Sequence, residues 1–424
     1  MHSWLALFDS CTKISTDSRN ITEGCMYIAL KGNNFNGNEF AASAIENGAK
    51  YAIVDQKEYI TNEKILYVED GLSFLQDLAH AHRLRFDIPV IGITGSNGKT
   101  STKELVKCCL EKKFTVLCTE GNLNNHIGVP LTLLKLKHEH QIAIIEMGAN
   151  KLFDIDELCR IAKPTHGLIT NIGKAHLEGL INFQGVLKTK TELYDHVVAN
   201  KGFLFVNEDD PVLFKEATQR TSKILTFGQQ KGQINGNLMK LDPFVHFSWR
   251  QNNYMSRHIK TNMVGKYNFY NFLAALCIGS FFKVDSEQLN EAIEAYWPDN
   301  NRSQVNQTKR NTLILDCYNA NPTSMLSALS SFVEIEHQDK LAILGDMLEL
   351  GQDGPQEHQK IIDFLKQHQI DFITVGSIFR NINPQGFERT NDLISAINLA
   401  QLENKLILLK GSRAIALEHL VDKL

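Results

Sequence analysis

The sequence has few of the features that mark secreted, metal-binding or membrane proteins. Its eight cysteines show no CxxC spacing and no histidine partners at zinc-finger spacing. They are expected to be reduced, mostly structural thiols in a cytosolic protein. No apolar run approaches the roughly 20 residues of a membrane span, and the first residues, MHSWLALFDSCTK, show no basic start followed by a long apolar stretch. These absences argue against a disulfide-stapled, finger-type or membrane-inserted protein.

An excess of positive charge is also missing. The formal net charge is −4 at pH 7, so neither nucleic acid nor a membrane surface is expected as a partner. Nine prolines and 27 glycines are spread thinly, and no segment is repeated or low in complexity, so linkers should be short. The composition, 43% apolar and 22% charged over 424 residues, is typical of a globular protein with roughly two to four domains.

Short apolar strands alternate with helical segments along the chain. One break falls at Asp87 and Pro89, where a helical stretch ends before a buried strand. A second break, WPDNNRSQ, falls at residues 297–304, after which the alternation restarts. The pattern predicts three α/β domains: a small N-terminal domain over 1–86, a central P-loop-type domain with a parallel sheet over 87–296, and a Rossmann-like C-terminal domain over 297–424.

A glycine turn, GITGSNGKTSTKE, joins an apolar strand to a helix at residues 92–104. Its glycines permit a tight turn that brings backbone N–H groups onto phosphate oxygens, its lysine supplies positive charge, and its threonine hydroxyl can bind Mg²⁺. The full GxxxxGK[ST] pattern would need glycine at Ile93, so the match is to the shorter GxxGKT form. The alternative is a Gly/Asn turn with a surface lysine. The predicted nucleotide-binding residues here are Gly95, Ser96, Asn97, Gly98, Lys99, Thr100 and Ser101.

Three further side chains are candidates for metal binding or acid–base chemistry. Glu146 ends the strand IAIIE, where a carboxylate would face a ligand crevice and suit Mg²⁺, although a capping or surface glutamate fits equally well. His176 follows the strand GLITN, although a lone histidine is more often structural. Lys190 lies on an expected helix, and spacing alone does not distinguish it from Lys188.

Polar side chains also follow strands of the third predicted domain. Asp316 ends TLILD, where it could accept a hydrogen bond from a ribose hydroxyl, and Asp346 ends LAILGD. Each could equally form a turn. The loop YNANP at 318–322 would offer amide donors and acceptors to a polar substrate, unless it is an asparagine-rich turn.

Together, stretches in a fixed order along the chain resemble the Mur ligase family. Their shared order over almost the whole length carries the resemblance, and YNANP and GDMLELG resemble the members that add a dipeptide. Besides the phosphate loop, the stretches are STDSR (15–19), YIALKGNNFNG (27–37), NLNNHIGVPLTLL (122–134), EMGAN (146–150), TNIGKAHLEG (170–179), DCYNANPTSM (316–325), LGDMLELG (344–351) and KGSR (410–413).

The resemblance implies an ATP-dependent amide ligase of cytoplasmic peptidoglycan precursor synthesis. In the family reaction, ATP phosphorylates the C-terminal carboxylate of a UDP-N-acetylmuramoyl-tripeptide. The amine of D-alanyl-D-alanine then attacks the acyl phosphate, and ADP and phosphate are released. Phosphorylation is needed because a carboxylate would have to expel oxide, and cations must neutralise the charge that accumulates. Three domains closing on small-molecule substrates would exclude water, and a monomer without nucleic-acid or membrane partners is expected.

The same resemblance assigns residues to the catalytic centre. Lys99 and Thr100 would hold the ATP phosphates and Mg²⁺, and Glu146 and His176 would be metal ligands. Lys190 matches a lysine that relatives carry as a carbamate, a modification that turns an amine into a carboxylate able to bind Mg²⁺. The family commonly reads Ala-Lys-Gly-Glu where this chain reads TKTE. The implied catalytic residues are therefore Lys99, His176 and Lys190.

Further positions match the substrate contacts of the family. Asn268 and Asn271 would approach the adenine, with Tyr267 standing where the family usually has histidine. The implied nucleotide contacts from the third domain are Arg302 and Asp316. The implied contacts to the uridine nucleotide are Ser18, Arg19, Asn36 and Gly37, in a loop where FNGN replaces the more usual Phe-Asp-Gly-His. The residues expected to face the muramoyl-peptide are Asn124 and Asn125. The residues expected to receive the dipeptide are Tyr318, Asn319, Asn321 and Ser324.

Two alternatives remain open at this point. A sister ATP-dependent ligase, either another Mur enzyme or a folylpolyglutamate synthetase-like protein, would share the phosphate loop and the central domain. The module STDSR…IALKG argues against the folate enzyme, and NANPTS stands where a diamino-acid-adding enzyme would show Asp-Asn-Pro followed by Arg or Lys. A regulatory protein that merely holds ATP would need the phosphate loop, but not Glu146, His176 and Lys190 together.

Overall fold

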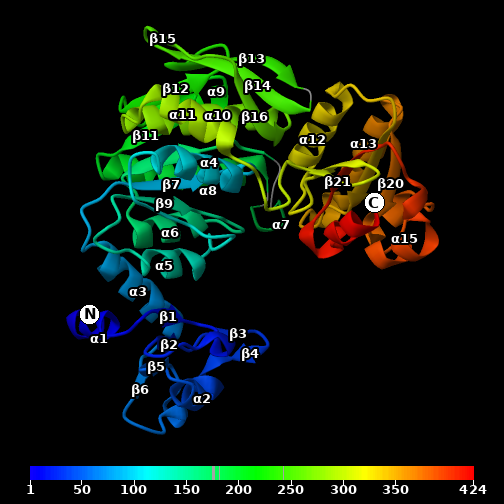
Figure 1. The fold of residues 1–424 in the computed structure, drawn as a ribbon. Coiled ribbons are helices and arrows are strands. Elements are labelled where there is room, and N and C mark those ends of the chain that lie inside the picture. Colours follow the sequence, from blue (N-terminus) through cyan, green and yellow to red (C-terminus); the bar gives the residue numbers. More distant parts are fainter. Residues whose placement is uncertain (174–176, 181, 242) are drawn as a thin grey trace.

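The computed structural model describes residues 1–173, 177–180, 182–241 and 243–424, which form three lobes with one main sheet each (Figure 1). Each lobe combines strands and helices, so the predicted class, three α/β domains, is confirmed. The predicted domain limits near residues 86 and 296 stay predictions. Within the described part of the chain, no helix has the length and apolar character needed to cross a membrane.

The N-terminal lobe is a parallel four-stranded sheet in the order β1-β2-β5-β6. Its central strands are apolar and almost wholly buried. The elements are α1 (His2–Asp9), β1 (Ile14–Ser15), β2 (Met26–Ile28), β3 (Lys31–Gly32), β4 (Phe35–Asn36), α2 (Ala41–Glu46), β5 (Tyr51–Val54) and β6 (Ile65–Tyr67). Strands β3 and β4 form a separate antiparallel hairpin.

Helix α3 (Gly71–Arg83) connects this lobe to the central one (Figure 1). It begins at Asp70, whose Oδ1 accepts a hydrogen bond from the Ser73 N–H at 2.7 Å, a typical N-cap. Its apolar residues recur at helical spacing, and Phe74 and Leu78 are buried in a core that continues into the central lobe. The helix is therefore shared by the cores of two lobes.

The central lobe is built on a ten-stranded sheet with helices on both faces. Strands β7 to β12 pair in parallel, as the sequence predicts, with β7 lying between β9 and β10. The strands are β7 (Val90–Thr94), β8 (Val116–Cys118), β9 (Ile142–Glu146), β10 (His166–Ile169), β11 (Phe203–Asn207) and β12 (Ile224–Gly228). The helices are α4 (Lys99–Leu110), α5 (Gly128–Leu133), α6 (Asp154–Ala162), α7 (Leu177–Leu180), α8 (Phe183–Ala199), α9 (Pro211–Thr218), α10 (Tyr267–Phe281) and α11 (Ser286–Ala295).

The sheet also has an antiparallel extension that the sequence analysis did not anticipate. Strand β13 pairs with β14 antiparallel, and β14 pairs antiparallel with both β15 and β16. These strands are β13 (Ile234–Leu241), β14 (Phe244–Gln251), β15 (Tyr254–Met255) and β16 (Ile259–Val264). Buried and partly buried residues alternate along most of β14, as in a sheet whose two faces are unequally covered. The predicted parallel sheet is therefore present, and antiparallel strands that were not predicted extend it.

The C-terminal lobe has a five-stranded sheet in the order β17-β18-β21-β19-β20. Four strands are parallel, and β17 is an antiparallel edge strand. The elements are β17 (Gln304–Gln307), β18 (Thr312–Leu315), α12 (Pro322–Glu334), β19 (Lys340–Gly345), α13 (Gly354–Gln367), β20 (Asp371–Val375), α14 (Ser377–Ile382), α15 (Thr390–Ala396) and β21 (Leu406–Lys410).

Candidate functional site

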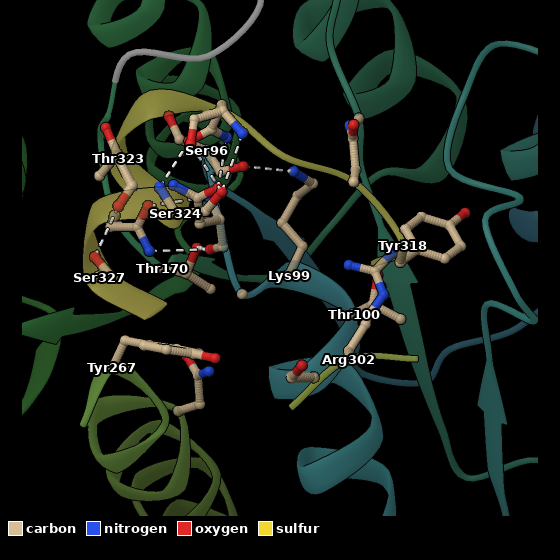
Figure 2. A pocket seen from close by; sticks show the side chains of 18 of the residues that line it. Ser96, Lys99, Thr100, Thr170, Tyr267, Arg302, Tyr318, Thr323, Ser324 and Ser327 are labelled. Atoms are coloured by element: carbon tan, nitrogen blue, oxygen red, sulfur yellow. Dashed lines mark hydrogen bonds between the residues drawn. The ribbon is translucent and has the colours of Figure 1, made fainter. Parts of the chain in front are cut away.

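The main cavity of the described chain lies between the central and C-terminal lobes (Figure 2). Its volume is about 990 Å³. Neighbouring strands β7, β9 and β10 all end at this cavity, so the loops that follow them face one another across it. From the opposite side, α12 and the segments around Arg302 and Tyr318 close it.

The phosphate loop follows β7 and requires glycine at two positions. Gly95 has φ +144°, and a Cβ there would overlap the Thr170 hydroxyl. Gly98 has φ +78°, and a Cβ there would lie 2.9 Å from Asn271 Oδ1. The Lys99 Nζ atom donates to the carbonyls of Gly95 at 2.7 Å and Ser96 at 3.3 Å. The loop thus curls around the half-buried Lys99 side chain at the start of α4.

Burial lowers the pKa of Lys99, and the nearby charge of Arg302 acts in the same direction, while the Glu146 carboxylate opposes both. Two cations and one buried carboxylate therefore lie within electrostatic reach of each other. Such a group would be stabilised by a ligand that carries several negative charges.

Glu146, at the end of β9, has an exposed fraction of 1%. Its Oε1 accepts hydrogen bonds from the Asn124 amide at 2.7 Å and from the Thr100 hydroxyl at 3.2 Å. Its Oε2 is buried and has no hydrogen-bond partner among the described residues. A buried carboxylate oxygen without a partner, next to a threonine hydroxyl, suits a hard cation such as Mg²⁺.

The rest of a metal site is not seen in the described residues. Within them, no group of three or more His, Cys, Asp or Glu side chains is arranged to hold a metal ion. His176, predicted as a ligand, lies outside the described residues. Thr100 and Glu146 are thus the two predicted metal ligands that the structure brings together at the cavity.

The structure separates Lys190 from Lys188, which spacing alone could not do. Both lie on α8, but Lys188 is exposed, with its Nζ 5.5 Å from the centre of the Phe153 ring. Lys190 has an exposed fraction of 1%. Burial lowers its pKa well below the usual value, and the charge of Lys99 lowers it further. Lys190 is therefore a buried, deprotonation-prone amine close to the phosphate loop, although it does not itself line the cavity.

Two asparagines of α10 line the cavity and also brace it. The Asn268 amide donates to the Val264 carbonyl at 2.7 Å and to the Ser303 hydroxyl at 2.8 Å. The Asn271 amide donates to Asn268 Oδ1 at 2.8 Å, while its own Oδ1 accepts from the Thr102 hydroxyl at 3.0 Å. These hydrogen bonds form a continuous network from helix α4, which follows the phosphate loop, to the C-terminal lobe.

A second network of hydrogen bonds joins the same two lobes. The Tyr267 hydroxyl lies 2.8 Å from the Ser303 hydroxyl, and the Ser303 N–H donates to Asp316 Oδ1 at 3.3 Å. Lys410 pairs with Asp316 Oδ2 at 2.5 Å. Burial raises the pKa of the Tyr267 phenol, which keeps it protonated. Sequence reasoning missed Ser303 and the role of Lys410, although Lys410 begins the KGSR stretch.

Two arginine side chains stack on one tyrosine ring beside these hydrogen bonds. The Arg302 guanidinium lies 3.8 Å from the centre of the Tyr318 ring, and the Arg413 guanidinium lies 5.0 Å from it. Arg302 and Tyr318 both line the cavity, and the Arg302 Nε atom is buried without a hydrogen-bond partner among the described residues. The stacking fixes a positive charge beside the phosphate loop.

The YNANP loop leads into α12 and faces the phosphate loop. Asn321 is the N-cap of α12, and its Oδ1 accepts from the Ser324 N–H at 2.9 Å. The Asn321 amide also donates to Asn97 Oδ1 at 2.7 Å. Asn319 lines the cavity too, and its Oδ1 accepts from the Ala320 N–H at 2.9 Å. The loop is thus a helix cap as well as part of the cavity wall.

The remaining predicted residues have mixed positions. Asn125 lines the cavity, but its Oδ1 accepts from the Gly128 N–H at 2.8 Å at the start of α5. Asp346 proves to be a helix cap, because its two carboxylate oxygens accept from the Ile378 and Phe379 N–H groups of α14 at 2.9 Å each.

The four predicted residues of the N-terminal lobe do not line this cavity: Ser18, Arg19, Asn36 and Gly37. Arg19 is exposed and pairs with Asp17 at 2.9 Å. Asn36 donates to Gln56 Oε1 at 2.8 Å. A Cβ at Gly37 would lie 2.6 Å from the Leu30 carbonyl oxygen, so this turn requires glycine.

Family models match three consecutive parts of the chain. They are the Mur ligase family catalytic domain over residues 10–83, the Mur ligase middle domain over 93–279, and the Mur ligase glutamate ligase domain over 301–413. The Bacillus subtilis UDP-N-acetylmuramoyl-tripeptide–D-alanyl-D-alanine ligase is 30% identical, with 97% of this chain and 92% of the relative covered. The Escherichia coli enzyme of the same name is 30% identical, with 97% and 93% covered.

Solved structures agree with these matches. A crystal structure of MurF from Acinetobacter baumannii has a TM-score of 0.87 at 31% identity and covers 97% of this chain and 92% of its own. The Thermotoga maritima MurF ligase in complex with ADP has a TM-score of 0.85 at 25% identity, with 98% and 97% covered. The similarity thus extends over all three lobes.

Proposed function

The chain belongs to the Mur ligase family, and from this premise we propose how its residues carry out the ligase reaction of its relatives. It is an ATP-dependent ligase that joins D-alanyl-D-alanine to UDP-N-acetylmuramoyl-tripeptide in peptidoglycan precursor synthesis. The observation that carries this conclusion is similarity over the whole length to ligases of that name. A phosphate loop and the buried Glu146 share one cavity with the third domain, which supports it.

Phosphate binding falls to the loop between β7 and α4. Its backbone N–H groups and the N-terminus of α4 are positioned for the outer phosphates of ATP. Lys99 releases the carbonyls of Gly95 and Ser96 and pairs with those phosphates instead. Ser96, Asn97 and Ser101 line the same wall of the cavity.

Magnesium is assigned to Thr100, Glu146, His176 and Lys190 as a carbamate. When bound, Mg²⁺ neutralises phosphate charge and orients the outer phosphates for transfer. The free Oε2 of Glu146 and the adjacent Thr100 hydroxyl supply hard oxygen donors. Burial lowers the pKa of Lys190, which favours the uncharged amine that reacts with CO₂, and the carbamate would supply a further oxygen donor.

The chemistry proceeds in two balanced steps. A carboxylate oxygen of the tripeptide attacks the γ-phosphorus, an O–P bond forms, and the bond to ADP breaks. The amine nitrogen of D-alanyl-D-alanine then attacks the carbonyl carbon, the C–N bond of the amide forms, the C–O bond to phosphate breaks, and the proton lost by nitrogen passes to the departing phosphate. Lys99 and Arg302 flank this position and offset the accumulating negative charge.

The nucleotide and the two peptides are assigned to different walls of the cavity. Asn268 and Asn271 support the adenine side, and Arg302 and Asp316 contact the nucleotide from the third domain. Asn124 and Asn125 face the muramoyl-peptide. Tyr318, Asn319 and Ser324 face the dipeptide, whereas the Asn321 amide is engaged at both ends and is not assigned a substrate contact.

The uridine nucleotide is assigned to the N-terminal domain, at Ser18, Arg19, Asn36 and Gly37. These residues lie in turns of the lobe that α3 attaches to the central domain. We also propose that the enzyme acts in the cytoplasm, because ATP and UDP-linked precursors are cytoplasmic metabolites. We further propose that it acts as a monomer.

The test is substrate-dependent phosphate release with detection of the amide product by mass. Release should require ATP, UDP-N-acetylmuramoyl-tripeptide and D-alanyl-D-alanine together. Glutamate, a single diamino acid and folate substrates serve as controls for sister ligases. Phosphate release that is indifferent to the two peptide substrates would contradict the proposed function.

A further inference from the structure

A hydrogen bond between two asparagines joins the phosphate loop to the third domain. The Asn321 Nδ2 atom donates to Asn97 Oδ1 over 2.7 Å, although 224 positions separate the two residues. Asn97 lies in the phosphate loop, and Asn321 is the N-cap of α12, whose residues line the opposite side of the cavity. The contact therefore connects the nucleotide side of the cavity with the acceptor side.

Each asparagine is fixed within its own domain. The Asn97 N–H donates to Asn171 Oδ1 at 3.0 Å, and its carbonyl accepts from the Thr170 hydroxyl at 2.6 Å. On the other side, the Asn321 oxygen is used by the Ser324 N–H at the cap. Because the cap requires the oxygen, the amino group of Asn321 must face Asn97. The surroundings thus fix the backbone of Asn97 and the side-chain orientation of Asn321.

The surfaces beside this bond fit closely. Gly173 follows β10, and a Cβ there would lie 3.0 Å from Thr323 Oγ1 and 3.2 Å from Thr323 Cγ2. The first turn of α12 therefore sits directly against the segment that supports the phosphate loop. A shift of the third domain would break this contact and the asparagine bond together.

We propose that Asn321 is a positioning residue that sets the third domain in register with the loaded phosphate loop. The inference rests on the proposed function, because it assumes that the acceptor amine arrives from the third domain. Asn321 acts through Asn97, which stands in the loop that holds the outer phosphates. The acceptor side of the cavity is thereby positioned from a residue next to the phosphate that is transferred. Loss of the bond should therefore impair the reaction with the dipeptide more than the binding of the nucleotide.

Asn321→Ser is the sharpest test, because the serine hydroxyl can still cap α12, whereas the amide group that donates to Asn97 is lost. The KM for D-alanyl-D-alanine should rise about tenfold and kcat should fall, while the Kd for ADP, measured by calorimetry, stays within about twofold. Asn321→Asp should be worse, since its carboxylate also caps the helix but repels phosphate. Asn97→Ala combined with Asn321→Ser should lose no more than the more impaired single variant, because both changes remove the same bond.

The matched control is Asp392→Ala. Asp392 Oδ2 accepts from the Arg389 N–H at 3.0 Å and so supports the start of another helix, α15, in the same domain. Its kinetics should match those of the unmodified enzyme. Unchanged dipeptide kinetics in Asn321→Ser, losses that multiply in the double variant, or a loss explained by a lower Tm would each overturn the proposal. Absence of amide formation by the unmodified enzyme would instead overturn the proposed function.

Discussion

The first and third domains are attached to the central domain by contacts of different balance, apolar packing being prominent at the first boundary and side-chain hydrogen bonds at the third, although each boundary contains both. At the first boundary, Leu78 of α3 shares a buried core with Leu133 of α5 and Ile155 of α6, and we call this contact the apolar seam. At the third boundary, Asn321 bonds to Asn97, and Ser303 bonds to Tyr267 and Asn268, a contact we call the polar seam. The apolar core of the third domain takes in Val264 of the central domain, with Phe244 packed beside it.

The difference indicates how the enzyme divides fixed from adjustable parts. Separating an apolar seam exposes buried surface to water, at about 25 cal/mol per Å², so the first domain is held in place. Hydrogen bonds of a polar seam can be exchanged for water at small net cost, so the third domain can leave and return. Substrate entry and product release are therefore expected to open the polar seam.

The variant with the largest expected effect tests whether amide formation takes place beside the polar seam. Lys99→Ala should lower amide formation by about 1,000-fold, because the transferred phosphate loses the cation of the phosphate loop. Tm should stay close to that of the unmodified enzyme, since Lys99 takes no part in the apolar seam. Substantial turnover by the variant, measured as amide product by mass spectrometry, would contradict the assigned role.

The next effect concerns the buried lysine behind the phosphate loop. Lys190→Ala should reduce kcat by about 100-fold, and formate or acetate should restore part of it by replacing the carbamate oxygens. Lys188→Ala is the control, because Lys188 lies on the same helix but is exposed. Full activity of Lys190→Ala without any additive would remove the carbamate from the mechanism.

A pair of variants compares the two seams directly. Leu78→Ala should lower the free energy of unfolding by about 3 kcal/mol with kcat little changed. Ser303→Ala should cost only about 1 kcal/mol but raise the KM for ATP about tenfold, because Tyr267 and Asn268 lose a shared partner. Urea unfolding and steady-state kinetics measure both quantities. If the two variants gave the same pattern, the distinction between the seams would be wrong.

The smallest effect is a pH dependence of the apolar seam. His82 of α3 lies 3.0 Å from the Leu136 carbonyl, and burial lowers its pKa below 6.5. His82 therefore binds a proton more readily in the unfolded chain than in the folded one. The contribution of neutral His82 to the free energy of unfolding is present above pH 6.5 and is lost as pH falls through the folded pKa. His82→Gln keeps a donor for Leu136 but cannot titrate. Its Tm should fall less between about pH 7 and pH 5 than that of the unmodified enzyme, and equal falls would exclude His82 as the cause.

Local sequence pattern was enough to predict the strands and turns around the phosphate loop. Glycine spacing predicted the turn at Gly95 and Gly98, and the apolar run before Glu146 placed its carboxylate at a strand end, where the cavity lies. These features depend on residues that are close in sequence, and the spacing of glycines and apolar residues reflects such local structure. Continuous apolar runs do not predict the antiparallel strands β13–β16, because buried residues alternate with partly buried ones along most of β14.

Contacts between distant segments could not be predicted in this way. Asn124 holds Glu146, and Asn321 reaches Asn97, yet nothing in the local pattern specifies either partner. Spacing likewise left Lys188 and Lys190 equivalent, because the packing of α8 against its neighbours decides which of them is buried. The partners depend on how the three lobes meet, which is a property of the tertiary structure.

The two carbonyls that hold the Lys99 amine have a consequence for nucleotide selectivity. The amine is already satisfied by Gly95 and Ser96, so an incoming anion must displace two existing bonds and does not meet an unshielded cation. A nucleotide with only its innermost phosphate offers too little in exchange, whereas a longer polyphosphate provides several oxygens at once. We therefore expect the loop to bind AMP much more weakly than ATP, because the phosphate must compete with the two carbonyls for the Lys99 amine before any lobe moves.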